Sequence, residues 1–166
     1  ETWDESSPTA TWRSRRAGQP FFHVQNYTTA HESGLQFTPE EMQADAIDTR
    51  DIRLAPYQPD TPVFRYTKAR YLARHRQLDR EIGELLAQLE PDGLADDTIV
   101  FYYGDHGGVM PRSKGYLYES GLHVPLVVYA PPKWRGLLPA APGSRLGGFV
   151  GFIRLAPTVV PLPGLE

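Results

Sequence analysis

The chain has 166 residues, enough for one domain with one buried core. Hydrophobic residues make up 40% and charged residues 22%, and the net charge is −3. This balance supplies no concentrated basic face for nucleic acid or for an anionic membrane. The absence of cysteine excludes disulfides, thiolate metal sites and a cysteine nucleophile within the chain. No segment approaches the roughly 20 apolar residues of a membrane span.

The first half of the chain predicts one strand and two helices. Residues 21–28 (FFHVQNYT) are aromatic and β-prone and follow Pro20, which predicts a strand. Thr38 precedes Pro39 and lies three residues before Glu41, a pattern typical of the start of a short helix. Leucine and isoleucine recur at helical spacing from about Val63 to Leu89, which predicts a long helix that ends before residues 91–93 (PDG).

Two continuous apolar runs of strand length follow the long helix, at residues 99–103 (IVFYY) and 124–130 (VPLVVYA). Such runs are typical of central strands that are covered on both faces. A helix, a buried strand, a loop and another buried strand together predict an α/β fold with a mainly parallel sheet sandwiched by helices. Near the end of the chain, Ala156-Pro157 predicts the first turn of a helix.

The residues with the most chemical promise come directly after the first of these runs. Asp105 and His106 lie at the carboxyl end of the predicted strand, where open α/β sheets bind ligands, and two glycines follow them. An acidic side chain and an imidazole on a rigid strand end can hold a metal. Lys114, on the next loop, can bind a doubly charged tetrahedral anion.

Structural interpretations of the same residues stay open at this point. Asp105 can cap a turn, and His106 can be a histidine whose hydrogen bonds are satisfied in the core. Lys114 can be solvated, and His31 can hydrogen-bond within its own loop. The aromatic residues Tyr116, Tyr118 and Trp134 can stack on a sugar ring, although packing within the protein is the simpler interpretation.

The order of several segments resembles the type I sulfatases of the alkaline phosphatase superfamily. The resemblance begins with residues 71–131, which contain the second part of the predicted long helix, the run TIVFYYGDHGG and the segment PRSKGYLYESGLHVPLVVYAP. It extends upstream through residues 19–33 (QPFF to AHES) and downstream through residues 152–164 (FIRLAPTVVPLPG). The resemblance therefore covers most of the chain in collinear order.

The resemblance implies a role for each candidate residue. Asp105 and His106 would be metal ligands, while Lys114 and His31 would bind the sulfate group and act in catalysis. The family metal is usually Ca²⁺; because imidazole suits transition metals better, Zn²⁺ or another divalent ion is the alternative. The substrate would be a sulfated small molecule or glycan, with no nucleic-acid or membrane partner, and the location would be periplasmic or secreted.

The chain also departs from the family pattern. It contains no C/S-x-P-x-R motif, from which the family makes its formylglycine nucleophile, and no paired N-terminal aspartates to complete the metal site. Residues 1–166 are therefore expected to be a single partial catalytic domain, inactive alone, with the formylglycine outside the chain. A metal-dependent phosphatase or phosphodiesterase of the same superfamily, and a non-catalytic relative that binds sulfated glycans, remain the alternatives.

Overall fold

The computed structural model describes residues 3–162, which form two compact units. The larger unit runs Tyr27–Ala141 and carries all of the predicted site residues, while the smaller unit combines residues before and after it. Residues 163 and 164, the end of the downstream segment that resembles the sulfatases, lie outside the described residues. Within residues 3–162, no helix combines the length and the apolar character that crossing a membrane requires.

The smaller unit contains the 3₁₀ helices η1 (Trp12–Ser14) and η5 (Phe152–Arg154) and the short helix α4 (Leu155–Val159). Helix α4 confirms the predicted helix start near Pro157. The strand predicted for residues 21–28 is wrong, because this segment is irregular in the structure. Its aromatic side chains instead pack beside the buried Trp12, with ring centroids 5.8 Å away for Phe21 and 5.2 Å away for His23.

The short helix α1 (Pro39–Ala44) begins where the sequence predicted. The Thr38 hydroxyl accepts a hydrogen bond from the Glu41 backbone N–H at 3.2 Å, and the Glu41 carboxylate accepts one from the Thr38 N–H at 2.7 Å. These reciprocal bonds form a capping box, which satisfies two backbone donors that a helix start leaves without partners.

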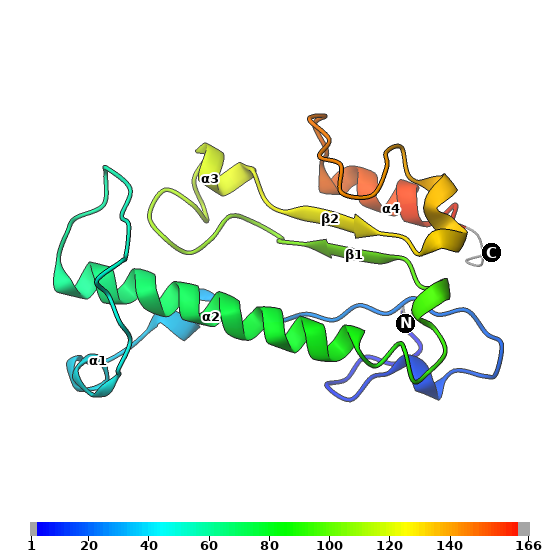
Figure 1. Cartoon of the computed structure of the whole chain (residues 1–166), viewed down its shortest axis with the longest axis horizontal. Helices are drawn as coiled ribbons and strands as arrows, with labels where there is room; N and C mark the ends of the chain where they lie inside the picture. Colours follow the sequence, from blue (N-terminus) through cyan, green and yellow to red (C-terminus); the bar gives the residue numbers. More distant parts are fainter. Residues whose placement is uncertain (1–2, 163–166) are drawn as a thin grey trace. The chain divides into compact units, whose positions relative to one another are not determined.

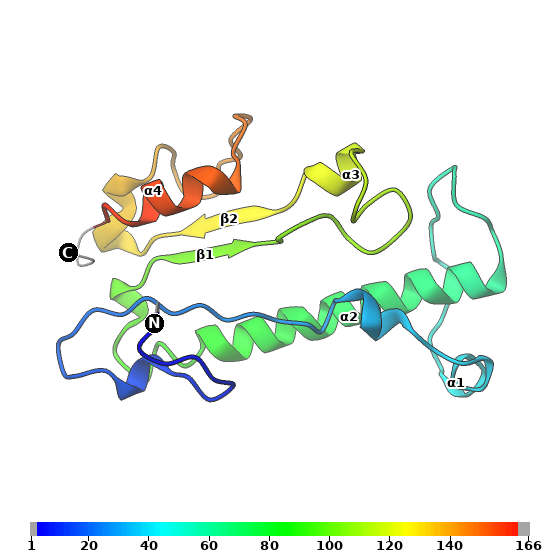
Figure 2. The same cartoon turned by 180° about the vertical axis from the view of Figure 1, so that it is seen from behind.

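The long helix α2 (Pro62–Leu86) confirms the predicted helix, and it ends three residues before Leu89. The chain then leaves through a turn in which Gly93 adopts φ +69°, a conformation that glycine reaches without steric cost. Helix α2 buries Tyr66 and Ala69. The 3₁₀ helix η2 (Glu32–Leu35) packs against it, as Figure 2 shows near the α2 label.

Strands β1 (Val100–Tyr103) and β2 (Leu126–Tyr129) form an antiparallel pair, with Val100 opposite Tyr129 and Tyr103 opposite Leu126 (Figure 1). The parallel pairing expected of these two strands is therefore wrong. A parallel pair needs a crossover connection of a dozen or more residues, which is usually built on an α-helix that packs on the sheet. The connection of residues 104–125 contains only the four-residue helix α3 (Glu119–Leu122), and the chain folds back as a long hairpin.

The two strands are also less covered than central strands would be. Tyr103 is 40% exposed and Val127 is 55% exposed, so the strand pair is not buried on both faces within residues 3–162. The helices and the strand pair agree with an α/β fold, and the mainly parallel sheet of the complete domain stays a prediction. The 3₁₀ helices η3 (Ala95–Asp97) and η4 (Pro132–Leu137) flank the pair and pack together.

Candidate functional site

Asp105 and His106 lie just beyond the end of β1, as the sequence predicted. His106 Nδ1 is 2.7 Å from the Gly107 carbonyl oxygen. A carbonyl can only accept a hydrogen bond, so Nδ1 carries the hydrogen and Nε2 of the neutral ring keeps its lone pair. This Nε2 lies 3.6 Å from Oδ2 of Asp105, whose side chain is 84% exposed. The loop thus places an imidazole acceptor and a carboxylate next to each other.

The separation of these two atoms suits a pair of ligands on one metal ion. Oxygen ligands lie 2.3–2.6 Å from calcium, so two ligands at a right angle are about 3.3–3.7 Å apart. Zinc, with shorter bonds and a wider tetrahedral angle, gives a similar spacing. The described residues contain no cluster of three or more histidine, aspartate or glutamate side chains that would hold a metal. Asp105 and His106 therefore fit two positions of a metal site and leave the other positions to other groups.

The glycines that follow are required by close packing. A Cβ atom on Gly107 would lie 2.2 Å from the Ser120 carbonyl oxygen, and one on Gly108 would lie 2.2 Å from the Tyr71 hydroxyl. The Gly107 N–H donates to the Gly121 carbonyl at 3.1 Å, which ties the loop to α3. Burial, together with the nearby Tyr102, raises the pKa of the Tyr71 phenol, so that this side chain stays a neutral packing partner.

Lys114 is held by the same loop through the main chain. Its N–H donates to the Gly108 carbonyl at 2.8 Å, so its backbone is linked to the Asp105–Gly108 segment. The neighbouring Ser113 is buried, and its hydroxyl donates to the Ser120 carbonyl at 2.7 Å. These bonds tie the backbone around Lys114 to the strand-end loop and to α3.

The Lys114 ammonium meets the segment that carries His31. Lys114 Nζ lies 3.2 Å from Glu32 Oε2, and His31 Nε2 lies 4.0 Å from the other oxygen of the same carboxylate. One carboxylate is thus shared by the two side chains that the sequence analysis assigned to the sulfate group. The Glu32 carboxylate thus lies beside both of the side chains that were predicted to bind the sulfate group.

The ring of His31 presents the opposite chemistry from that of His106. His31 is the N-cap of η2, and its Nδ1 accepts the Ser33 N–H at 3.3 Å. Because Nδ1 accepts, the hydrogen of the neutral ring is on Nε2, which faces the Glu32 carboxylate. His31 therefore offers a donor to an anion, whereas His106 offers a lone pair to a metal.

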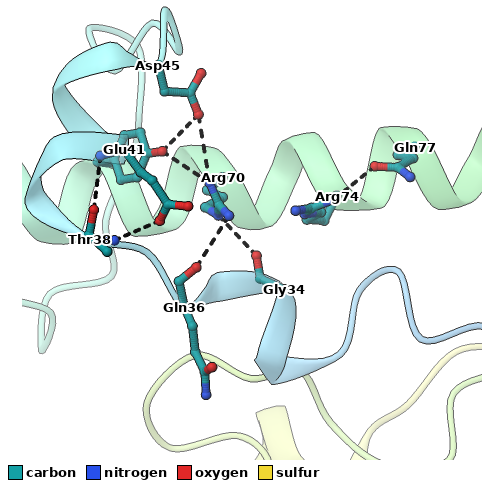
Figure 3. A network of polar contacts seen from close by, with 9 residues as sticks. Gly34, Gln36, Thr38, Glu41, Asp45, Arg70, Arg74 and Gln77 are labelled. Carbon is teal, nitrogen blue, oxygen red and sulfur yellow. Dashed lines mark hydrogen bonds and ion pairs between the residues drawn. The ribbon is translucent and has the colours of Figure 1, made fainter.

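Helix α2 anchors the His31 segment at two points. Upstream, the Thr29 hydroxyl donates to the Glu81 carboxylate, and this bond, with a second from Gln77, lowers the pKa of Glu81. Downstream, Arg70 Nε donates to the Gly34 carbonyl at 3.0 Å, and Arg70 also reaches the Gln36 carbonyl (Figure 3).

Arg70 is itself held by other side chains, among them Asp45, whose Oδ2 lies 3.9 Å from Arg70 Nη1 (Figure 3). The Arg70 guanidinium donates to the Tyr66 hydroxyl at 3.2 Å, and this hydroxyl donates to the Asp45 carboxylate at 2.8 Å. The Arg70 side chain is only 17% exposed. The Arg70 guanidinium, held by these partners, donates to the Gly34 and Gln36 carbonyls, which the turn of η2 leaves without a backbone partner among the described residues.

The structure therefore forms two pairs, Asp105 with His106 and Lys114 with His31, and joins them through the Lys114–Gly108 hydrogen bond. Glu32 was not predicted from the sequence, although its position next to His31 was a usable signal. The anchoring role of Arg70 was not predicted either, and the sequence carries no signal for it, because the partner carbonyls lie more than 30 residues away.

Comparison with known proteins gives one consistent result. The family model Sulfatase matches residues 8–165. The ulvan-active sulfatase of Formosa agariphila is 35% identical to the chain, in an alignment that covers 98% of this chain and 32% of that protein. Human N-sulphoglucosamine sulphohydrolase is 29% identical over 78% of this chain, and human iduronate 2-sulfatase is 25% identical over 96% of it.

The chain spans about a third or less of the length of these relatives. No solved structure matches it significantly. The family match nevertheless runs through both units and includes the two residue pairs described above. The resemblance seen in the sequence is thus confirmed, and the chain belongs to the sulfatase family.

Proposed function

We propose that this chain is part of a sulfatase that hydrolyses sulfate esters of a sulfated sugar or an aryl sulfate. The observation that carries the proposal is the opposite chemistry of the two histidines. His31 directs an N–H toward an anion that Lys114 also contacts, while His106 keeps a lone pair beside the Asp105 carboxylate. A sulfate ester at a metal needs both kinds of group.

In this proposal Lys114 and His31 bind the sulfate group. The Lys114 ammonium neutralises charge on the sulfate oxygens, and the Nε2–H of His31 donates to one oxygen or to the leaving group. The Glu32 carboxylate holds both side chains toward one point before substrate arrives. The sulfate ester carries one negative charge, as the carboxylate does, but it presents three terminal oxygens, so it can accept hydrogen bonds from both donors in place of Glu32.

Asp105 and His106 are proposed as two ligands of a divalent metal. Bound there, the metal would act as a Lewis acid toward the sulfate oxygens. Calcium is the proposed ion on the family pattern, and the imidazole ligand keeps zinc as the alternative. A formylglycine nucleophile, a single catalytic domain that includes residues 1–166 and export from the cytoplasm are further parts of the proposal that rest on family membership.

A sulfated carbohydrate is the substrate class that the relatives support. Their names refer to ulvan, N-sulphoglucosamine and iduronate, all of which are carbohydrates or their components. No relative in this set is named as a phosphatase. The phosphatase and the binding protein, the alternatives that the sequence left open, therefore have no observation in their favour.

The proposal is tested by separating sulfate binding from metal binding in the full-length protein. His31→Ala and Lys114→Ala are expected to weaken binding of inorganic sulfate and to abolish hydrolysis of 4-nitrophenyl sulfate, with the affinity for Ca²⁺ or Zn²⁺ retained. Asp105→Ala and His106→Ala are expected to lower metal affinity by roughly ten- to a hundredfold or more.

A matched control is Lys133→Ala. Lys133 also pairs with a carboxylate, Asp97 at 2.6 Å, but outside the site. Its variant should retain hydrolysis and both affinities. Wild-type hydrolysis rates in Lys114→Ala or Asp105→Ala would refute the assignment of the site.

A further inference from the structure

Arg112, two residues before Lys114, carries a guanidinium without a hydrogen bond or ion pair in the part of the chain that the structure describes. Its guanidinium carbon lies 4.4 Å from the ring centroid of Tyr57 and 5.3 Å from that of Tyr118. A cation over the faces of two aromatic rings is attracted to both. The rings therefore hold the guanidinium in place and leave its N–H donors unused.

The backbone at Arg112 is strained. Its φ is +68°, and Arg112 is the only residue other than glycine with a positive φ among the described residues. This region is unfavourable for an L side chain, and strain of this kind accumulates at ligand sites. The Ser120 hydroxyl donates to the Arg112 carbonyl at 2.6 Å, and the adjacent Ser113 is buried, so the surrounding loop maintains the conformation.

Arg112, Tyr57 and Tyr118 line an open hollow of about 510 Å³, together with Glu119, Ser120 and His123. This volume falls within the usual range of small-molecule sites, about 300–1,000 Å³. Glu119 is the acidic residue of the lining, and it accepts a hydrogen bond from His123 Nδ1 at 2.8 Å. Because Glu119 is engaged by His123, the charge of Arg112 is available to an anion from outside.

Tyr116 and Tyr118, for which the sequence left both packing and sugar stacking open, keep about half of their surface exposed. Tyr118 is 49% exposed and Tyr116 is 59% exposed, and their ring centroids lie 6.2 Å apart. Exposed aromatic rings beside an unpaired cation suit a sugar that carries an acidic group. The rings contact the apolar C–H surface, and the guanidinium binds the acid.

We propose that Arg112, flanked by Tyr57 and Tyr118, binds a second anionic group of the sugar whose sulfate ester is hydrolysed at Lys114. This inference rests on the proposed function. The second group is a carboxylate or a second sulfate, since the guanidinium fork matches either with two parallel hydrogen bonds. The Cα atoms of Arg112 and Lys114 are at most about 7 Å apart, so one disaccharide can reach both cationic side chains.

The test compares three disaccharides in the full-length protein: one with a single sulfate, one with a sulfate and a uronate carboxylate, and one with two sulfates. Affinity is measured by calorimetry and turnover by sulfate release, with 4-nitrophenyl sulfate as the small substrate. The wild type is expected to bind at least one of the two doubly acidic sugars roughly tenfold or more tightly than the singly sulfated one. The sugar that gains identifies the group that Arg112 binds.

Arg112→Gln is expected to remove this preference, and its kcat/KM should fall about tenfold more for the preferred disaccharide than for 4-nitrophenyl sulfate. Arg53→Gln, the same change at an exposed arginine of the same unit, is the control and should keep the preference. Arg112→Lys, which keeps the charge and loses the planar fork, carries the test if the glutamine variant does not fold.

Equal preference in Arg112→Gln and in the wild type, or no preference in the wild type, would overturn the proposed subsite. Failure of the proposed function gives a different result, because the wild type would then release sulfate from none of the substrates. The affinities still decide on Arg112 in that case. A preference that Arg112→Gln removes supports the subsite even without turnover.

Discussion

Gly107→Ala is expected to damage the site through packing alone, without removing any chemical group. A Cβ atom at this position would lie 2.2 Å from the Ser120 carbonyl oxygen and 2.6 Å from Gly121 Cα. Optimal contacts between carbon atoms are about 3.5–4.0 Å. Because both neighbours are backbone atoms of α3, no side-chain rotation relieves the clash, and the loop must move away from α3 by about 1 Å.

The expected cost follows from two contributions. Overpacking of this kind costs about 1–3 kcal/mol, and loss of the hydrogen bond from the Gly107 N–H to the Gly121 carbonyl costs about 0.5–1.5 kcal/mol. Alanine also restricts the unfolded chain, which offsets about 0.4–1 kcal/mol. The free energy of unfolding should therefore fall by about 2 kcal/mol, within a range of about 0.5–4 kcal/mol. Lys114 moves with the loop through its bond to Gly108, so sulfate affinity should fall as well.

Urea unfolding followed by circular dichroism measures the stability change, and calorimetry measures sulfate affinity. Gly136→Ala is the matched control, because Gly136 has open space where its Cβ atom would lie. This control should be neutral or stabilise the protein by up to about 1 kcal/mol. If Gly107→Ala and Gly136→Ala unfold at the same urea concentration, the packing of the strand-end loop against α3 is not as described.

Three further predictions concern the surroundings of the site. Glu32→Gln removes the carboxylate 3.2 Å from Lys114 Nζ and should raise the affinity for inorganic sulfate by roughly two- to fivefold in calorimetry; weaker binding would show that Glu32 does not compete with the anion. Arg70→Met removes the charged donors to the turn of η2 and should lower the free energy of unfolding by about 2–4 kcal/mol, whereas methionine at an exposed arginine of α2 should change it by less than about 0.5 kcal/mol. The hydrogen bond from Lys133 lowers the pKa of Asp97 below its usual 3.8, so this residue stabilises the folded state above about pH 4, and the stabilisation is lost as the pH falls through the lowered pKa. Asp97→Asn should flatten this part of the stability profile between about pH 2 and pH 5, and an unchanged slope would contradict the assignment.

Local patterns in the sequence were sufficient for the helices. The capping box at Thr38 and the leucine spacing of α2 act between residues three or four positions apart, and both helices begin where predicted. The strand predicted at residues 21–28 failed because β propensity needs a partner strand, and the aromatic side chains found Trp12 instead. The direction of pairing between β1 and β2 depends on the path of the connection, which residue types alone do not specify.

By itself, the sequence determined the family and the identities of the candidate residues His31, Asp105, His106 and Lys114, because collinear motifs and residue types survive without coordinates. Only the tertiary structure decided which atoms these residues present. The tautomers of His31 and His106 depend on a backbone N–H and a carbonyl beside each ring, and the shared carboxylate of Glu32 depends on a loop brought across more than 80 residues. Such contacts are set by how the chain packs, because a hydrogen bond depends on distance and direction as well as on residue type.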